Sequence, residues 1–410
     1  MQQTSTPEAG GSGAGGSHGL LPLFAVFFRL GLTSFGGPVA HLAFFRDEFV
    51  TRRRWLGERA YADLVALCQF LPGPASSQVG MGIGLTRAGI PGAIAAWLGF
   101  TLPSAIVMVA AGYGVLAMDT GGEPGWLAGL KIVAAAVVAQ AVWGMARSHA
   151  ADPVRIVLAV AAGAIAIAWP AGAGQIVAIL LGGLFGLLIP ERHAVPDDGD
   201  RLPAAVSRRT AFGALILFAA LLVLLPILSD KTDLATVRIA DAAYRSGALV
   251  FGGGHVVLPL LQEATVGPGW IGVDAFVAGY GLVQAVPGPL FTFSAYLGTV
   301  MSFGPGGVLG GAIMLVAIFL PSFLLVVGVL PFWDGLRRRV LLRRALSGVN
   351  AAVVGLLLAA LWDPVITSAI HDWIDAALAL LALAALMLWR VPPWLVVALG
   401  AAAGAVIGAL

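Results

Sequence analysis

The hexapeptide QFLPGP at residues 69–74 occurs again, with two substitutions, as QAVPGP at residues 284–289. Both copies lie within long apolar sequence, and a proline next to a glycine interrupts a helix. The two triplets therefore mark two broken helices at related places. Their order and spacing are the clearest indication that the chain consists of two repeats.

The repeat extends to both sides of these triplets. FRLG at residues 28–31 and FGG at 35–37 return as YRSG at 244–247 and FGG at 251–253, while LPS at 102–104 returns at 320–322. Apolar helices match by chance in Ala, Leu and Val, but not in Arg, Gln and Pro-Gly-Pro in the same order. We therefore divide the chain into a disordered tail (1–18), a first repeat (19–190), a linker with a central helix (191–230) and a second repeat (231–410).

Composition indicates a membrane protein. Hydrophobic residues make up 59% of the 410 residues, charged residues only 11%, and the mean hydropathy is +0.94, whereas a soluble domain carries about 25% charged residues. Charge-free runs such as 391–410 are long enough to cross a bilayer as helices. No strand-like alternation stands out, so the fold class is an all-α polytopic membrane protein.

The same composition argues against other classes. A net charge of +2 gives no reason to expect a nucleic-acid partner. The single cysteine, Cys68, excludes an internal disulfide, and no Cys/His cluster offers a metal site. We expect neither a metal nor a cofactor.

Basic residues indicate how the repeats are oriented, because short cytoplasmic loops are rich in Lys and Arg. The loop at 46–59 carries five arginines, and its counterpart at 259–274 carries no Lys or Arg. The two repeats are therefore expected to have inverted topology, joined through an extra central transmembrane helix at 211–228. The N-terminus is then cytoplasmic and the C-terminus periplasmic, and segments 20–49 and 60–86 become broken or re-entrant hairpins.

Paired helix breaks are expected to form the binding site. A break frees backbone N–H and C=O groups, which persist in a membrane only when they are buried in protein or line a cavity. The restarting helix presents N–H donors and a partial positive charge, which suit an anion. The predicted substrate-binding residues are Arg29, Gly36, Gly37, Pro72, Gly73, Pro74, Ser76, Ser77, Gln78, Arg245, Gly252, Gly253, Pro287, Gly288, Pro289 and Thr292.

Four ionisable residues are candidates for proton coupling. His41 and His255 follow the glycine breaks, and Glu48 and Glu263 lie beside the next loops. A histidine titrates near neutral pH, although a structural role for each histidine and a solvated position for each glutamate are alternatives. Arg29 in its apolar segment is expected to act on the substrate or, alternatively, to extend toward the lipid headgroups.

At these motifs the sequence resembles the chromate ion transporter family in its long, two-domain form, over about residues 20–410. The resemblance implies efflux of chromate, a sulfate-like dianion, across the bacterial inner membrane, driven by the proton motive force or by anion exchange. The chain departs from strict repetition where Gly254 replaces the Pro38 of the first repeat. A passive oxyanion channel and a membrane enzyme acting on lipid phosphates are the alternatives, and a homodimer is the assembly that we expect.

Overall fold

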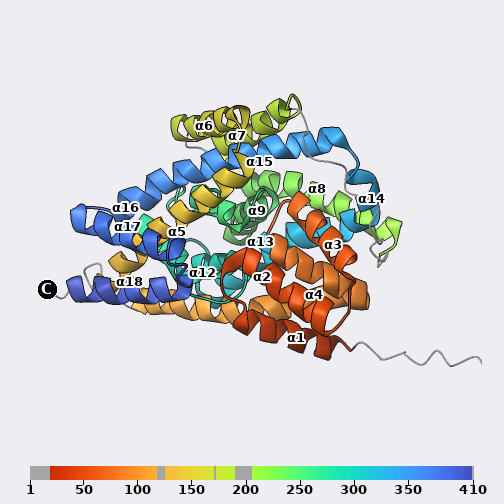
Figure 1. The fold of residues 1–410 in the computed structure, drawn as a ribbon, viewed down its shortest axis with the longest axis horizontal. Helices are drawn as coiled ribbons and strands as arrows, with labels where there is room; N and C mark the ends of the chain where they lie inside the picture. Colours follow the sequence, from red (N-terminus) through yellow and green to blue (C-terminus); the bar gives the residue numbers. More distant parts are fainter. Residues whose placement is uncertain (1–18, 118–124, 170–171, 190–205, 409–410) are drawn as a thin grey trace, which may run out of the picture.

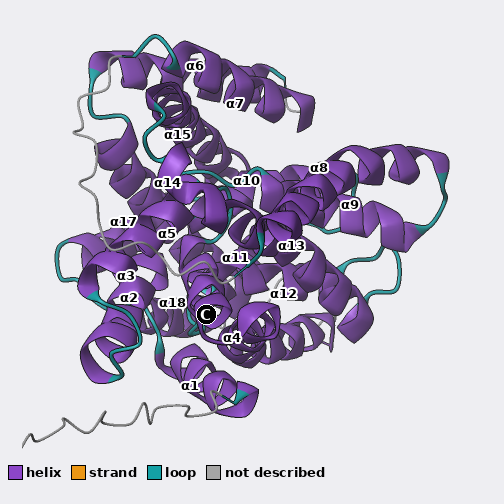
Figure 2. Cartoon of the chain, turned by 90° about the vertical axis from the view of Figure 1, so that its right-hand side faces the viewer, coloured by secondary structure: helices purple, strands orange, loops and turns teal. Residues whose placement is uncertain are grey.

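The computed structural model describes residues 19–117, 125–169, 172–189 and 206–408, and every regular element within these ranges is a helix (Figures 1 and 2). Five helical segments are long and apolar enough to cross a membrane: Ala75–Ala117, Gly125–His149, Arg208–Lys231, Gly307–Leu336 and Val340–Ala369. The prediction of an all-α polytopic membrane protein is confirmed.

The first repeat comprises α1 (Leu20–Thr33), α2 (Gly37–Arg46), the π-helix η1 (Asp47–Arg52), α3 (Glu58–Phe70), α4 (Ala75–Ala117), α5 (Gly125–His149), α6 (Pro153–Ala168) and α7 (Gly172–Gly186). The central helix is α8 (Arg208–Lys231). The second repeat comprises α9 (Ala235–Ala248), η2 (Gly254–Val256), α10 (Val257–Thr265), α11 (Val273–Val283), η3 (Leu290–Thr292), α12 (Phe293–Val300), α13 (Gly307–Val329), η4 (Leu330–Phe332), α14 (Trp333–Leu336), α15 (Val340–Ala360), η5 (Leu361–Ile366), α16 (Thr367–Ala369), α17 (Trp373–Met387) and α18 (Pro393–Ile407).

The helices are interrupted where the repeated motifs predict. In the first repeat, α1 stops before the Phe-Gly-Gly motif and α2 starts at its last residue, Gly37. Likewise α3 stops before Pro-Gly-Pro and α4 starts after it. The second repeat is broken at the same two motifs, between α9 and η2 and between α11 and η3. Gly36 and Gly252 have φ angles of 99° and 77°, which L-residues rarely adopt. Glycine is therefore required at these turns.

The two repeats interlock. Within each repeat a half-length helix packs along a long one, α1 on α4 and α9 on α13. The last helix pair of each repeat, however, packs against the other repeat: α6 and α7 lie on α15, and α17 and α18 lie on α5 (Figure 1). Close backbone approach at small residues is how helices associate in lipid. Neither repeat therefore completes its core alone, and the breaks are held where the two repeats meet.

Candidate functional site

The helix breaks of the two repeats are hydrogen-bonded to each other in a reciprocal pattern. The Gly73 N–H donates to the carbonyl oxygen of Val250 at 2.7 Å, and the Gly288 N–H donates to the carbonyl oxygen of Ser34 at 3.0 Å. Val250 precedes the glycine break of the second repeat, and Ser34 precedes that of the first. Each Pro-Gly-Pro break is thus bound to the glycine break of the opposite repeat, which brings all four breaks to one centre.

Two separate reasons, the backbone conformation and the lack of space for a Cβ, require glycine at the middle of each Pro-Gly-Pro triplet. Gly73 and Gly288 have φ angles of 123° and 102°, a region essentially confined to glycine. A Cβ on Gly73 would overlap the Ser322 hydroxyl, and one on Gly288 would lie 2.8 Å from the Ser104 hydroxyl. These serines belong to the repeated Leu-Pro-Ser motifs, so the third pair of motifs also packs at this centre.

A cavity of about 540 Å³ opens at the centre. Its wall comes from both repeats, because Gly36, Gly37, Pro38, Gly253, Gly254 and His255 line it together with Gln284, Gly288 and residues of α5 and the α17–α18 turn. The starts of α2 and of the three-residue turn η2 both lie in the wall. Most of the wall is apolar, and its polar side chains are those of Gln140, His255, Gln284 and Arg390.

This cavity lies beside the two glycine breaks and the second Pro-Gly-Pro break. Residues 72–78 of the first repeat are not part of its wall. One reason is visible in the backbone, since the Gly73 N–H is already bonded to Val250. Thr292 is buried, and its hydroxyl donates to the Pro289 carbonyl at 2.8 Å, so it too is engaged within its own break.

His41 connects the first break to this centre. Its Nε2 lies 3.1 Å from the Ser34 carbonyl oxygen and its Nδ1 lies 3.3 Å from the Ser76 hydroxyl. A carbonyl only accepts, so Nε2 carries the proton and Nδ1 accepts from Ser76. His41 therefore holds Ser34 and Ser76 together from a buried position. His255 differs, because it lines the cavity while its Nδ1 lies 2.6 Å from the Tyr280 hydroxyl.

Several buried polar atoms at this centre have no hydrogen-bond partner within the described part of the chain. They are Ser34 Oγ, Ser77 Oγ, Gln78 Oε1, Thr101 Oγ1, Gln284 Nε2 and Ser322 Oγ. Leaving a buried polar group unsatisfied costs about 1–3 kcal/mol. Of these residues only Gln284 lines the cavity, and the others lie at or next to the repeated motifs.

The two arginines predicted to act on the substrate are each paired with a carboxylate away from the central cavity. Arg29 lies 2.6 Å from Glu48, whose side chain is only 5% exposed and also accepts from Arg53 at 2.7 Å. Arg245 forms two bonds to Asp241, at 2.9 and 2.6 Å. Neither arginine lines the central cavity.

A second polar cavity, of about 480 Å³, lies between α7, α8, α9 and α10. Arg245 and Asp241 line it, and so does Glu263, the repeat counterpart of Glu48. Arg238 is in the same wall. The ionisable residues that the sequence singled out in the second repeat, apart from His255, therefore gather here and not at the centre.

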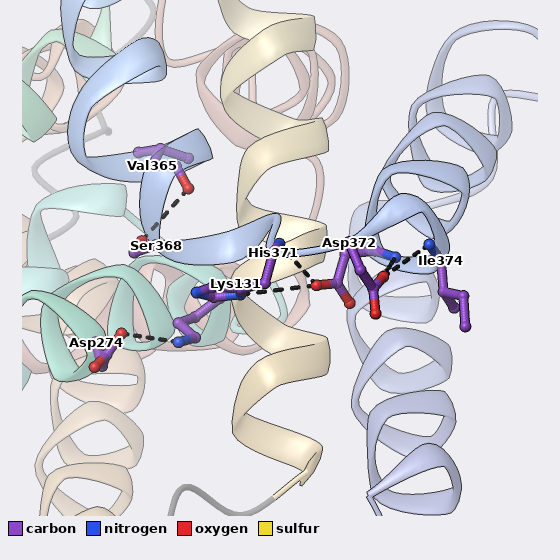
Figure 3. Close-up of polar contacts among 8 residues, drawn as sticks. Lys131, Asp274, Val365, Ser368, His371, Asp372 and Ile374 are labelled. Carbon is purple, nitrogen blue, oxygen red and sulfur yellow. Dashed lines mark hydrogen bonds and ion pairs between the residues drawn. The ribbon is translucent and has the colours of Figure 1, made fainter.

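Sequence reasoning overlooked a buried lysine. Lys131 on α5 has a side chain only 2% exposed, and its Nζ lies 2.8 Å from a carboxylate oxygen of Asp274 at the start of α11 (Figure 3). The pair joins the first repeat to the second. Lys131 precedes the residues of α5 that line the cavity. A lysine directly before the charge-free run 132–146 was the available signal, because a charge inside a membrane protein is costly unless it has a role.

Two interlocked repeats of membrane-spanning helices, with paired breaks around a central cavity, define a membrane transporter. The particular family is clear from comparison, because the family model described as "Chromate transporter" matches residues 21–187 and again 237–405. The chain belongs to the chromate transporter family. The duplicate match coincides with the two repeats.

Curated relatives agree with this membership. The chain is 30% identical over 343 residues to the chromate transport protein of Pseudomonas aeruginosa, covering 82% of this chain and 78% of that protein. It is 26% identical over 395 residues to the chromate transport protein of Cupriavidus metallidurans, covering 93% and 90%. An uncharacterized transporter of Methanocaldococcus jannaschii is 24% identical over 378 residues, 90% of each chain. No solved structure matches the chain.

Proposed function

We propose that this protein exports chromate, or a related tetrahedral oxyanion such as sulfate, across the bacterial inner membrane through the central cavity. The observation that carries the proposal is the reciprocal bonding of the four breaks, Gly73 to Val250 and Gly288 to Ser34. It brings the starts of α2 and η2 and the unpartnered Gln284 amide nitrogen to the wall of one cavity. A tetrahedral dianion presents four oxygens that accept hydrogen bonds, and it suits such an enclosure.

The same bonds suggest how alternating access would operate. Each bond joins one repeat to the other, so a relative movement of the repeats must break or shift both of them. Inverted repeats that rock about a fixed midplane site can shift these two hydrogen bonds while each repeat keeps its own fold. Coupling to the proton motive force or to a counter-anion belongs to the proposal, with His255 the ionisable candidate in the cavity wall.

Purified protein in proteoliposomes tests the proposal directly. Chromate, sulfate, molybdate and phosphate fluxes are measured with and without a pH gradient, and with and without a trans anion. A coupled transporter accumulates chromate or sulfate against its gradient when a proton gradient or trans anion is imposed. Equilibration without accumulation under every condition would favour a passive channel, and no oxyanion flux above that of empty liposomes would refute the proposal.

A further inference from the structure

The turn between α17 and α18 reaches the central cavity from within the membrane. Each of the two helices has 15 residues, which corresponds to about 22 Å, whereas the hydrocarbon core is about 30 Å thick. Figure 1 shows both helices running from the end of the molecule that carries the C-terminus to a turn well inside its outline. The turn, residues 388–392, therefore lies at membrane depth, and Arg390 to Pro393 form part of the cavity wall.

Arg390 occupies an unusual backbone conformation in this turn. Its φ angle is 53°, in the left-handed region that non-glycine residues seldom adopt. Hydrogen bonds on both sides maintain the turn, from the Trp389 N–H to the Ala384 carbonyl at 3.3 Å and from the Val391 N–H to the Ala385 carbonyl at 2.9 Å. A left-handed residue shortly after a helix is a common way to end it, and here it fixes the turn at the cavity wall.

The charge of Arg390 is not compensated. Among the residues that line the cavity, it is the only Lys, Arg, Asp or Glu. Its guanidinium makes no hydrogen bond or ion pair with any described part of the chain, whereas Arg29 and Arg245 each contact a carboxylate. Arg390 is exposed, and a charged side chain at membrane depth faces a water-filled cavity or a partner. The cavity wall therefore carries a single positive charge that is open to an anion.

Other parts of the cavity wall contain uncharged hydrogen-bond donors. The starts of α2 at Gly37 and of η2 at Gly254 present backbone N–H groups, and the buried Gln284 Nε2 has no partner among the described residues. The turn is also attached to the first glycine break, because the rings of Phe35 and Trp394 lie 6.3 Å apart. The charge and the donors are thus held in one arrangement by packing between the repeats.

The arginine is present in only one repeat. The sequence Trp389-Arg390 follows the penultimate helix of the second repeat, and the corresponding sequence of the first repeat reads Trp169-Pro170. The first repeat therefore has no arginine at the position equivalent to Arg390.

We propose that Arg390 is the residue that recognises the charge of the transported oxyanion in the central cavity. This role rests on the proposed function above. The guanidinium donates to two oxygens of the anion in the fork geometry that arginine forms with oxyanions, while backbone N–H groups of α2 and η2 and the Gln284 amide donate to the others.

Equilibrium binding of radiolabelled sulfate and of chromate to the full-length protein in nanodiscs tests this role. Arg390→Gln is expected to raise the Kd about ten- to a hundredfold, the range for loss of hydrogen bonds to a charged ligand. Arg390→Lys keeps the charge without the fork, so its Kd should lie between those of Arg390→Gln and the wild type. Arg209→Gln, at the exposed start of α8, is the matched control and should leave the Kd unchanged.

A further variant separates recognition from folding. Asparagine tolerates the left-handed region better than arginine does, so Arg390→Asn relieves backbone strain while it removes the charge. It should retain the thermal midpoint and monodisperse elution of the wild type and still bind as weakly as Arg390→Gln. Wild-type affinity in both Arg390→Gln and Arg390→Asn would overturn the role of Arg390 and leave the proposed function intact. Failure of the wild type to bind either anion would overturn both.

Discussion

Gly31→Ala is a sharp test of how the repeats position their breaks. Gly31 lies on the face of α1 that packs along α4, and a Cβ at this position would lie 2.7 Å from the Phe100 carbonyl oxygen and 3.0 Å from that of Gly99. Both are backbone atoms, so no side chain can rotate away. To bring the Cβ to an ordinary contact of about 3.4 Å, α1 would have to move from α4 by about 0.7 Å.

The expected energy follows from two opposing effects. Overpacking of this kind costs about 1–3 kcal/mol, whereas alanine is favoured over glycine within a helix by about 0.5–1 kcal/mol. The net effect of Gly31→Ala is a destabilisation of up to about 2.5 kcal/mol. Gly213→Ala on α8 is the matched control, because a Cβ there meets nothing within 4 Å and only the favourable effect remains.

The consequence for function is also specific. The helix that contains Gly31 ends at Thr33, and the next carbonyl, that of Ser34, accepts from the Gly288 N–H. Movement of α1 should lengthen this bond and lower chromate flux by more than the loss of folded protein explains. Gly247→Ala is the repeat counterpart, since a Cβ there would overlap the Ile318 carbonyl oxygen.

The assay combines unfolding of purified protein in mixed detergent micelles, followed by tryptophan fluorescence, with proteoliposome flux normalised to inserted protein. Gly31→Ala should unfold earlier than the wild type and Gly213→Ala at the same point or later. Equal effects of the two substitutions would refute the packing argument. Normal flux per folded molecule in Gly31→Ala would refute the connection to the break.

The remaining predictions concern orientation, a buried ion pair and a break. In a cysteine-free background, a cysteine at Gly267 should react with an impermeant thiol reagent from outside, and one at Arg53 only after permeabilisation; labelling of both from one side would contradict the inverted topology. Asp274→Asn should lower the free energy of unfolding, as measured in detergent, because it removes the carboxylate that lies 2.8 Å from the buried Lys131 Nζ; an unchanged free energy would contradict a stabilising role for this pair. Pro287→Ala should let the preceding helix continue and abolish chromate flux without loss of membrane insertion, and unchanged flux would count against a role for that break.

Local signals were sufficient to predict the class of fold and the positions of the breaks. Hydropathy depends on composition alone, so long charge-free runs predict membrane helices wherever they later pack. The helix breaks depend on the backbone preferences of proline and glycine within a few residues, and repetition of Pro-Gly-Pro at 72–74 and 287–289 distinguished them from incidental kinks. Both predictions agree with the observed helix boundaries.

Other properties of the site depend on which groups meet across the repeats, and only the tertiary structure decided these. Arg29 looked like an unpaired charge in an apolar segment, yet the folded chain places Glu48 2.6 Å away. Folding brings Arg390, which the sequence analysis did not single out, to the wall of the central cavity. A neighbouring opposite charge weakens the attraction of a charged group for a ligand, and such neighbours can come from distant parts of the sequence. For the same reason the N–H of Gly73, free in any local reading, is bonded to Val250 of the opposite repeat.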